Sequence, residues 1–596
     1  MGIFRRFLLL STILAAGPVV AMGTPESSTE TPQTKIDDTK ISTGNENPDL
    51  GKAGSYLAAR YASRHQDNQK ASYFLSHTLE HDPYNTGLMG KVIRQYVLSG
   101  DIDNAVKVAE NSASLNEKNN LLHLLLFVNA VKKDDNANAK LHLDAIDGFG
   151  LNAITKPFYE AWLSYQATHN VKEIKPAIEL KNSFYDALKY YQQALIYDLS
   201  GDMRKASLYY ELATKKPDQD PYRVIVAAVD FYRRQGDLER ARGLYKSYQQ
   251  ESDGNLIADT ADADQLMKEL SSHGNKKLVS SPSEGVAEVL LNIAHLLATE
   301  QVTPETMVYI RLALYLRPEF PEAELLMGNI LEEQGQYEQA IAAYDRIPSG
   351  TQMFRRGQIR KAFSLDSLGR TDEGLSLLES MANQYSKPSD IYMSIGDLFR
   401  RKENYAAATD AYTSAIKAIG SLERHHWPLL YARGICYEQA GNWPKAEADF
   451  NQALKLEPDQ PDVLNYLAYS WLVQGNKIKD AQKMLERAVA ERPDDANIID
   501  SLGWASYLQG NYQEALEYLE QAVELMPHDP TVNDHYGDAL WQLGRHTEAR
   551  YQWERALYYK PKAEADRVRI EQKMKTGVAS SSSDARTANK TPTNAE

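Results

Sequence analysis

Two short stretches near the carboxyl end of the chain decide its fold. Residues 499–504 read Ile-Asp-Ser-Leu-Gly-Trp, and residues 533–541 read Asn-Asp-His-Tyr-Gly-Asp-Ala-Leu-Trp. Their glycines, Gly503 and Gly537, lie 34 residues apart. Self-similarity at a fixed period is typical of repeat architectures. Each glycine is followed at the same offsets by Ala, a large residue, Ala and Pro, namely Ala515, Leu519, Ala522 and Pro527, and then Ala549, Trp553, Ala556 and Pro561.

The period extends well beyond these two stretches. Most steps between the small positions are 34 residues, and the exceptions of 35 and 38 residues indicate loop insertions. The same register continues, with a weaker pattern, back to Ala59. Repeats therefore use nearly all of the chain between its two ends. Going back from Gly503, the small positions are Ala468, Gly434, Gly396, Ala362 and Gly328.

Each residue type in the repeat has a physical reason. Small residues at fixed positions let two antiparallel helices approach closely, and large residues fill the space beside them. The proline ends the second helix because it cannot continue the hydrogen-bond ladder. A glycine supplies the tight reversal between the two helices. The pattern therefore predicts an all-α fold of helix–turn–helix repeats. The turn glycines are Gly441, Gly475, Gly510 and Gly544.

This pattern resembles the tetratricopeptide repeat family. The resemblance implies an α-solenoid, a right-handed superhelix in which each repeat contacts only its neighbours and a long concave face is formed. We expect two blocks of repeats, a degenerate one at residues 51–250 and one near consensus at residues 286–575. Gly, Ser and Pro signals in residues 251–285 indicate a hinge or irregular joint, with a hidden degenerate repeat as the alternative.

Both ends of the chain differ from the repeats. A basic region followed by an apolar run is typical of a secretory signal peptide, so we predict cleavage of residues 1–21, with cleavage after Gly23 as the alternative. The composition of residues 22–50 and 576–596 predicts a disordered linker and a disordered tail. No cysteine follows the apolar run, so we expect no covalent lipid anchor. The expected location is the periplasm, and an uncleaved N-terminus anchored in the inner membrane is the alternative.

The composition excludes several classes of function. The chain has 66 Lys and Arg against 81 Asp and Glu, a net charge of −15, which argues against nucleic acid as a partner. Its one cysteine, Cys436, cannot form an internal disulfide or a thiolate zinc site. The repeats leave no segment for a separate catalytic domain. We therefore expect no enzyme and no cofactor.

One motif has the spacing of a catalytic site. His77, Glu80 and His81 match the spacing of inverted zinc peptidases, which places both histidines on one helical face. The segment lies inside the second helix of the first repeat, where a polar helix face is the simpler interpretation. We predict no metal site, and keep a metallohydrolase as a rival hypothesis.

The helical periodicity of the sequence predicts which residues line the concave face near the C-terminus. On the first helix of each repeat, the face opposite the second helix recurs at i, i+3, i+7 and i+10. Aromatic side chains with nearby hydrogen-bonding groups suit an extended peptide or an apolar helix. Packing between repeats and helix capping are the alternative role. The candidate binding residues here are Asn465, Tyr469, Asp500, Trp504, Tyr507, Asp534, Asp538 and Trp541.

The concave face near the N-terminus has a different character. The same arithmetic places Arg60, Arg64 and Arg94 on it. A basic surface of this kind would suit an acidic segment or a chain-terminal carboxylate. A solvated charged face is the alternative interpretation.

Residues 460–560 also resemble exported tetratricopeptide repeat proteins of the Gram-negative cell envelope. Some of those proteins are adaptors of carboxyl-terminal processing proteases, although the adaptors are typically lipoproteins. The resemblance implies a non-enzymatic periplasmic scaffold or adaptor that binds peptides or proteins, with a processing protease and its substrates as candidate partners. The alternative is a scaffold for envelope polysaccharide secretion or outer-membrane assembly.

Overall fold

The chain is all-α, as the sequence predicts. The computed structural model describes residues 51–115, 118–171, 185–215, 221–251, 263–272, 274, 276–300, 302–385 and 388–578. Regular structure within these residues is helical, with 29 α-helices and a short 3-10 helix, η3 (Arg424–His426). The predicted signal peptide, the predicted linker and most of the predicted tail lie outside the described residues.

The helices form two compact units, divided between Gln384 and Tyr385. The first unit contains α2 (Lys52–Arg64), α3 (Asn68–Glu80), α4 (Thr86–Ser99), α5 (Ile102–Ser112), α6 (Asn120–Lys132), α7 (Asn136–Ala145), α8 (Leu151–Thr168), α9 (Asp186–Ser200), α10 (Met203–Thr214), α11 (Pro221–Arg234), α12 (Leu238–Glu251), α13 (Ala263–Ser272), α14 (Pro282–Glu300), α15 (Pro304–Leu316), α16 (Pro321–Glu333), α17 (Tyr337–Asp345), α18 (Gln352–Ser367) and α19 (Thr371–Ala382). The second unit contains α20 (Ser389–Arg401), α21 (Tyr405–Ile419), α22 (Trp427–Gln439), α23 (Trp443–Leu456), α24 (Pro461–Val473), α25 (Ile478–Glu491), α26 (Ala496–Leu508), α27 (Tyr512–Leu525), α28 (Pro530–Gln542), α29 (His546–Tyr558) and α30 (Glu564–Thr576).

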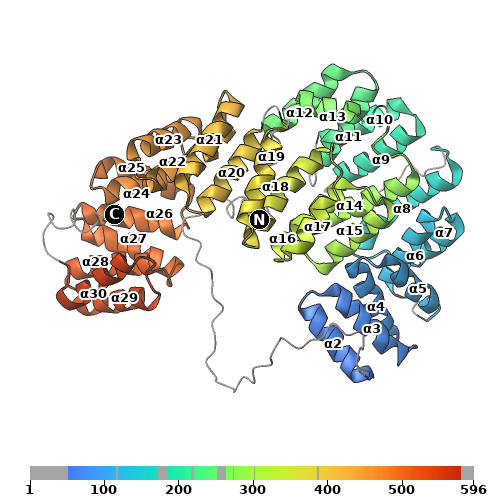
Figure 1. Cartoon of the computed structure of the whole chain (residues 1–596), viewed down its shortest axis with the longest axis horizontal. Coiled ribbons are helices and arrows are strands. Elements are labelled where there is room, and N and C mark those ends of the chain that lie inside the picture. The colour runs from blue at the N-terminus through green and yellow to red at the C-terminus, as the bar shows by residue number, and fades with distance from the viewer. Residues whose placement is uncertain are drawn as a thin grey trace. The chain divides into compact units, whose positions relative to one another are not determined.

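Consecutive helices pack as helix–turn–helix pairs, which Figure 1 shows most clearly from α20 to α29. The two helices approach so closely that a side chain at the small position would clash. A Cβ atom added at Gly434 would lie 2.6 Å from the ring of Phe450, and one added at Gly537 would lie 2.6 Å from the ring of Trp553. Each ring comes from the second helix of the same pair. The large residue of the second helix therefore packs directly on the small position of the first helix.

The turns and helix ends confirm the roles that the sequence predicts for the turn glycines and the helix-ending prolines. Gly441, Gly475, Gly510 and Gly544 all have positive φ angles, between 66° and 82°, which a residue with a side chain rarely adopts. Helices α23 and α27 end two residues before Pro458 and Pro527. A residue that precedes proline is disfavoured in the helical conformation, so the helix stops there.

Helices on both sides of residues 251–285 share one core, so the observed division of the chain differs from the expected one. Helix α14, which begins at the end of this segment, and α15, which follows it, pack on α4, α6, α8 and α9. One hydrophobic cluster therefore runs from Ile93 to Met353. The described part of the segment contains α13.

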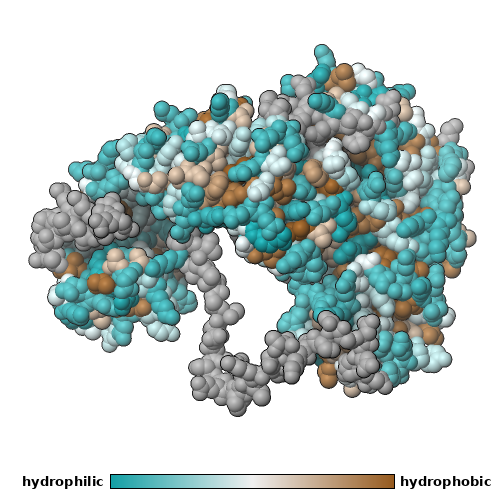
Figure 2. Space-filling view, viewed as in Figure 1, coloured by the Kyte–Doolittle hydropathy of each residue, from teal (hydrophilic) through white to brown (hydrophobic). Residues whose placement is uncertain are grey.

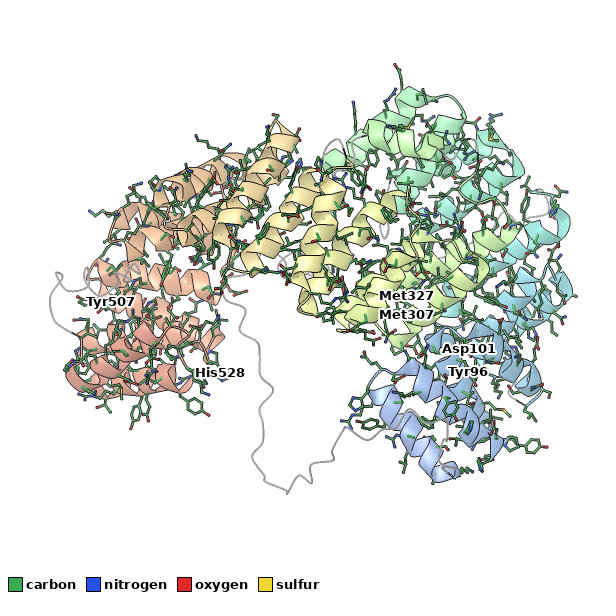
Figure 3. The ribbon with its side chains drawn as sticks, in the orientation of Figure 1. Tyr96, Asp101, Met307, Met327, Tyr507 and His528 are labelled. Atoms are coloured by element: carbon green, nitrogen blue, oxygen red, sulfur yellow. The ribbon has the colours of Figure 1, made fainter. Side chains whose placement is uncertain are left out.

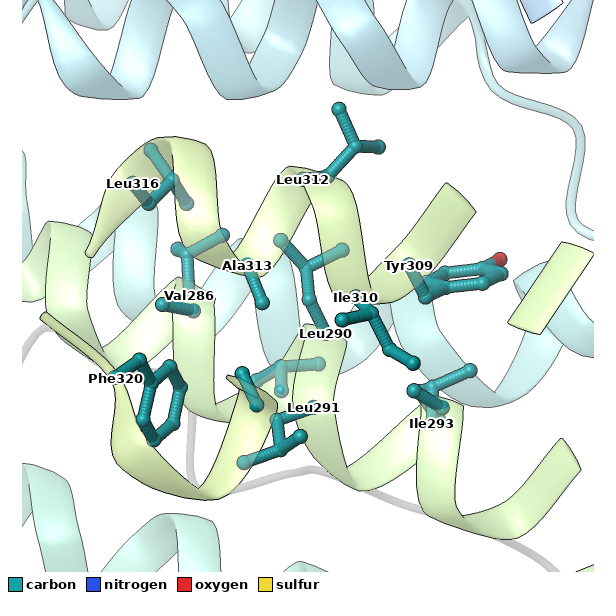
Figure 4. Packing of buried hydrophobic residues seen from close by; sticks show 14 of the residues in the cluster. Val286, Leu290, Leu291, Ile293, Tyr309, Ile310, Leu312, Ala313, Leu316 and Phe320 are labelled. Carbon is teal, nitrogen blue, oxygen red and sulfur yellow. The ribbon is translucent and has the colours of Figure 1, made fainter. Parts of the chain in front are cut away.

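The composition of α14 explains this packing. Val286, Ala287, Val289, Leu290 and Leu291 are fully buried, and residues this close together in the sequence point in different directions around the helix. A helix that is apolar on every side has to be covered by other elements. Figure 4 shows side chains of α14 packed against α15, while Leu312 of α15 points away toward another helix.

The surface of the molecule is mainly hydrophilic on the face drawn in Figure 2, with scattered hydrophobic residues.

We expect Gly537→Ala to lower the free energy of unfolding of the C-terminal repeats by about 1–3 kcal/mol, because the new Cβ atom overlaps the Trp553 ring. The matched control is Gly243→Ala in α12, where the added Cβ atom meets nothing within 4 Å. This change should be neutral or stabilise the chain by up to about 1 kcal/mol. Thermal unfolding followed by circular dichroism measures both, and equal effects would contradict the close-contact account.

Candidate functional site

The concave positions of the first unit lie together on one surface. We name it the N-terminal concave face, and its members include Arg94 of α4, Val128 of α6, Trp162 of α8, Tyr191 of α9 and Arg223 of α11. The last four side chains are at most 2% exposed. The surface is buried because α14 and α15 lie against it. Figure 3 labels Tyr96 of α4 and Met307 of α15, two helices that pack together at this surface.

Hydrogen bonds between side chains fix α14 and α15 in place. The Gln192 amide donates to Asn292 of α14 over 2.8 Å, and its oxygen accepts from the Trp162 indole N–H over 2.8 Å. The hydroxyl of Tyr315 in α15 donates to Asn129 of α6 over 3.0 Å. These bonds satisfy polar groups that the close packing removes from water. They also select one register of α14 and α15 on the surface.

A buried ion pair joins the N-terminal concave face to α14. The Arg223 guanidinium, 2% exposed, donates to both carboxylate oxygens of Glu288, which is fully buried. Glu322 of α16 accepts a further hydrogen bond from Arg223, and the Tyr191 hydroxyl donates to Glu288 over 3.2 Å. Burial alone would lower the pKa of Arg223, but the two carboxylates raise it, so the guanidinium stays charged.

The predicted basic residues of this face divide into two groups. Arg94 is half-buried and forms a 2.5 Å ion pair with Glu305 at the start of α15, so the chain itself supplies its acidic partner. Arg60 and Arg64 lie on α2 and are exposed. The structure therefore brings Arg94, but not Arg60 or Arg64, against α15. An external acidic ligand would have to displace Glu305 to reach Arg94.

The C-terminal concave face is formed by first helices of the second unit. Its members are Tyr431 of α22, Asn465 and Tyr469 of α24, and Asp500 and Trp504 of α26. Tyr431, Asn465, Tyr469 and Trp504 are half-buried, so each keeps part of its side chain in contact with solvent. Helix α26 packs on both α24 and α28, which makes the face continuous toward the C-terminus. Four of these residues, Asn465, Tyr469, Asp500 and Trp504, are among those that the sequence predicts for this face.

Trp504 is the centre of an aromatic stack on this face. Its ring is 4.7 Å from the Tyr507 ring and 4.1 Å from the His535 ring, and both pairs are nearly parallel. His535, on α28, also contacts the Asp500 carboxylate through Nδ1 at 3.0 Å. Burial alone would lower the pKa of His535, but the carboxylates of Asp500, Asp534 and Asp538 raise it above its usual value. Trp504 therefore stacks on a histidine that favours its charged form.

Helix α30 covers the end of the C-terminal concave face. Lys573 contacts Asp534 at 2.8 Å and Asp538 at 2.7 Å. Arg569 reaches Asp534 at 3.1 Å. Both carboxylates are at most 3% exposed, so Arg569 and Lys573 of α30 satisfy the acidic positions predicted there.

The last predicted aromatic residue is also used within the chain. The Trp541 ring lies 5.4 Å from Trp553 and 4.1 Å from His546. Gly577, just after α30, lies so close to Trp541 that an added Cβ atom would be 1.9 Å from its ring. Trp541 therefore packs between elements of the last repeat. Of the other residues predicted for the C-terminal concave face, Asn465, Tyr469 and Trp504 are the ones that keep contact with solvent.

Sequence reasoning missed three contributors to this surface: His535, Arg569 and Lys573. A signal was present for the last two, because they are four residues apart and so share one helical face, at a spacing that matches Asp534 and Asp538. His535 had no comparable signal, since its position faces the neighbouring repeat rather than the groove.

The candidate zinc motif lies at the end of α3. Glu80 and His81 are exposed, and His77 is half-buried. The Nδ1 atom of His81 contacts the backbone carbonyl of His77 at 2.9 Å, so one ring nitrogen is already engaged. Among the residues that the structure describes, no three His, Cys, Asp or Glu side chains are placed to share a metal ion. Nor is any described helix both long enough and apolar enough to span a membrane.

We expect removal of the buried ion pair to destabilise the first unit. Glu288→Gln leaves Arg223 without its main counter-charge, which typically costs about 3–5 kcal/mol. The control is Glu305→Gln, because both side chains of the Arg94–Glu305 pair keep contact with solvent and the pair should contribute at most about 1 kcal/mol. Urea unfolding with hydrogen exchange of residues 282–316 measures both, and equal losses would contradict a buried attachment of α14.

We also expect a pH dependence that requires His535. The folded chain holds the His535 proton to a higher pH than the unfolded chain, where the pKa is about 6.5. Its contribution to stability is therefore complete below about pH 6.5 and is lost as the pH rises through the folded pKa. Thermal midpoints of the wild type and His535→Gln, measured across this range, should converge at high pH. A constant difference between the two would contradict the assignment.

Comparison with known proteins agrees with the repeat architecture. The tetratricopeptide repeat family matches residues 326–560. The TPR repeat-containing protein PA4667 of Pseudomonas aeruginosa is 26% identical over 197 residues, which cover 33% of this chain and 32% of that protein. Cellulose synthase operon protein C of Xanthomonas axonopodis is 23% identical over 207 residues, which cover 32% of this chain and 14% of that protein.

The matched region thus spans a third or less of the length of these two relatives. Among solved structures, the APC/C hetero-tetramer Cut9–Hcn1 is 14% identical, covers 89% of this chain and 96% of that one, and has a TM-score of 0.37. The repeat spacing, the paired helices and the family match lead to one conclusion. Residues 326–560 are a region of tetratricopeptide repeats.

Proposed function

We propose that this chain is a non-enzymatic scaffold that binds peptide or protein partners on its C-terminal concave face. A tetratricopeptide repeat scaffold implies protein–protein interaction. The observation that supports this particular face is the row of half-buried aromatic side chains at Tyr431, Tyr469 and Trp504. The N-terminal concave face is a poorer candidate because α14 and α15 already cover it.

The chemistry of the C-terminal concave face favours an extended peptide or an apolar helix. Half-buried aromatic rings supply large contact area at a low loss of conformational entropy. The Oδ1 atom of Asn465 is buried and has no hydrogen-bond partner among the described residues, so it has room for one donor. A backbone N–H of a bound peptide would supply this donor after a small side-chain rotation. Burial, together with the Asp500 charge, raises the pKa of Tyr469, which keeps its hydroxyl a donor.

The proposed setting is the periplasm. Its support is the basic and apolar N-terminal pattern together with the resemblance of residues 460–560 to exported envelope proteins. Within this setting the scaffold would present substrates to a processing protease. Several weak contacts along one rigid surface would raise the local concentration of a substrate beside the protease.

The second candidate function is a scaffold for envelope polysaccharide secretion or outer-membrane assembly. One observation favours it, namely the partial likeness to cellulose synthase operon protein C. Affinity purification from envelope extract separates the two candidates. Enrichment of a protease supports the adaptor role, whereas enrichment of synthase or outer-membrane components supports the second role.

Photo-crosslinking tests the proposed binding face directly. We expect a photoreactive amino acid at Tyr431, Asn465 or Tyr469 to capture the same partner in cells. The matched controls are Leu525 and Tyr551, which are 45% and 62% exposed on second helices of the same unit. Capture from the control positions alone would contradict the proposal.

The captured partner then allows a quantitative test. We expect Tyr469→Ala with Trp504→Ala to weaken its binding by more than about 2 kcal/mol, because aromatic anchors dominate such surfaces. Calorimetric titration measures this loss. Thermal unfolding of the same variant provides the control, since a melted second unit would mean that the two rings serve packing instead.

A further inference from the structure

Helix α2, the first helix that the structure describes, has an exposed apolar edge. Leu57 and Tyr61 of α2 are 63% and 69% exposed, and they lie four residues apart on one helical face. Helix α2 packs on α3, and no described residue precedes Gly51. Large apolar side chains of this kind are usually covered at the end of a repeat array.

The equivalent positions in internal repeats show what normally covers this edge. Counted from the small position, Leu57 and Tyr61 correspond to Ser501 and Ala505 of α26, which are 4% and 0% exposed. They also correspond to His535 and Ala539 of α28, which are 5% and 0% exposed. In both repeats the preceding pair of helices packs on this side: α24 and α25 on α26, and α26 and α27 on α28. His535 itself lies against Asp500 and Trp504 of α26. The open edge of α2 therefore has the shape of a site for one more helix.

The other end of the repeat array has such a cover. Helix α30 packs on α29, and its Ile570 is 1% exposed. Basic side chains of α30 meet the acidic positions of α28, as described above. A terminal helix in this chain is thus held by apolar burial combined with opposite charge.

The charges on α2 indicate the chemistry of the missing helix. The helix carries Lys52, Arg60 and Arg64 and has no Asp or Glu, in a chain whose net charge is −15. Arg60 and Arg64 are exposed and flank the apolar pair, and neither forms an ion pair with a described carboxylate. A second copy of α2 would place like charges against each other, which disfavours self-association through this edge.

We propose that the exposed edge of α2 is a second docking site, which takes an acidic amphipathic helix of a partner protein. Its apolar face covers Leu57 and Tyr61, and its carboxylates meet Arg60 and Arg64. The site lies at the open end of the array and is separate from the C-terminal concave face. The bound helix extends the solenoid by one layer, in the position that α25 occupies on α26.

A designed peptide tests this site on the full chain. The probe is a fluorescent helical peptide with leucines along one face and glutamates on both flanks, and its binding is measured by anisotropy. We expect Leu57→Asp with Tyr61→Asp to weaken binding at least about tenfold. The control is Leu141→Asp with Phe149→Asp, two residues that are 61% and 81% exposed elsewhere in the first unit and should leave binding unchanged.

Charge reversal provides a second and independent test. Arg60→Glu with Arg64→Glu should lose the glutamate peptide and gain binding of the same peptide with lysines in place of glutamates. Three results would overturn the proposal. They are no binding of the glutamate peptide to the wild type, binding to phosphatidylglycerol vesicles that the Leu57 and Tyr61 changes abolish, and a dimer in sedimentation that the same changes dissociate.

Discussion

The structure depends on one contact, the seating of a large side chain from the second helix of a repeat over a glycine of the first. At Gly434 and Gly537 the space for even a single methyl group is already filled by an aromatic ring. This contact fixes the distance between the helices of a pair. Repetition of the pair then fixes which side chains of every first helix face away from their partner helix. The concave faces therefore follow from the same spacing that makes the fold recognisable in the sequence.

The two concave faces differ in how far other helices of the chain cover them. The N-terminal concave face is occupied by α14 and α15, which are held there by apolar burial and by the Arg223–Glu288 ion pair. Such a buried pair depends on both partners, because either charge alone would be strongly destabilising in the interior. The C-terminal concave face keeps half-buried aromatic rings, and only its last positions are covered by α30. The concave positions that keep contact with solvent are thus concentrated where the repeat is closest to consensus.

Much of the fold was predictable because its determinants are local. The turn glycines, the helix-ending prolines and the small positions each act within one repeat, so their spacing alone places them. The membership of Tyr469 and Trp504 in one surface was predictable for the same reason. The covering of Asp534 by Lys573 and of Arg223 by Glu288 was not, because helix register shows which way a side chain faces but not what lies opposite. The apolar character of α14 on all sides was the one available signal that this helix is buried.

The central claim is that the N-terminal concave face is filled by the chain itself, while the C-terminal concave face stays open. Amide hydrogen exchange of the full chain, resolved by mass spectrometry, tests this claim most directly. Local opening exposes amides in proportion to the stability of each segment. The account predicts that amides of α14 exchange as slowly as those of α9, on which it packs. Rapid exchange throughout α14 and α15, beside a protected α9, would contradict it.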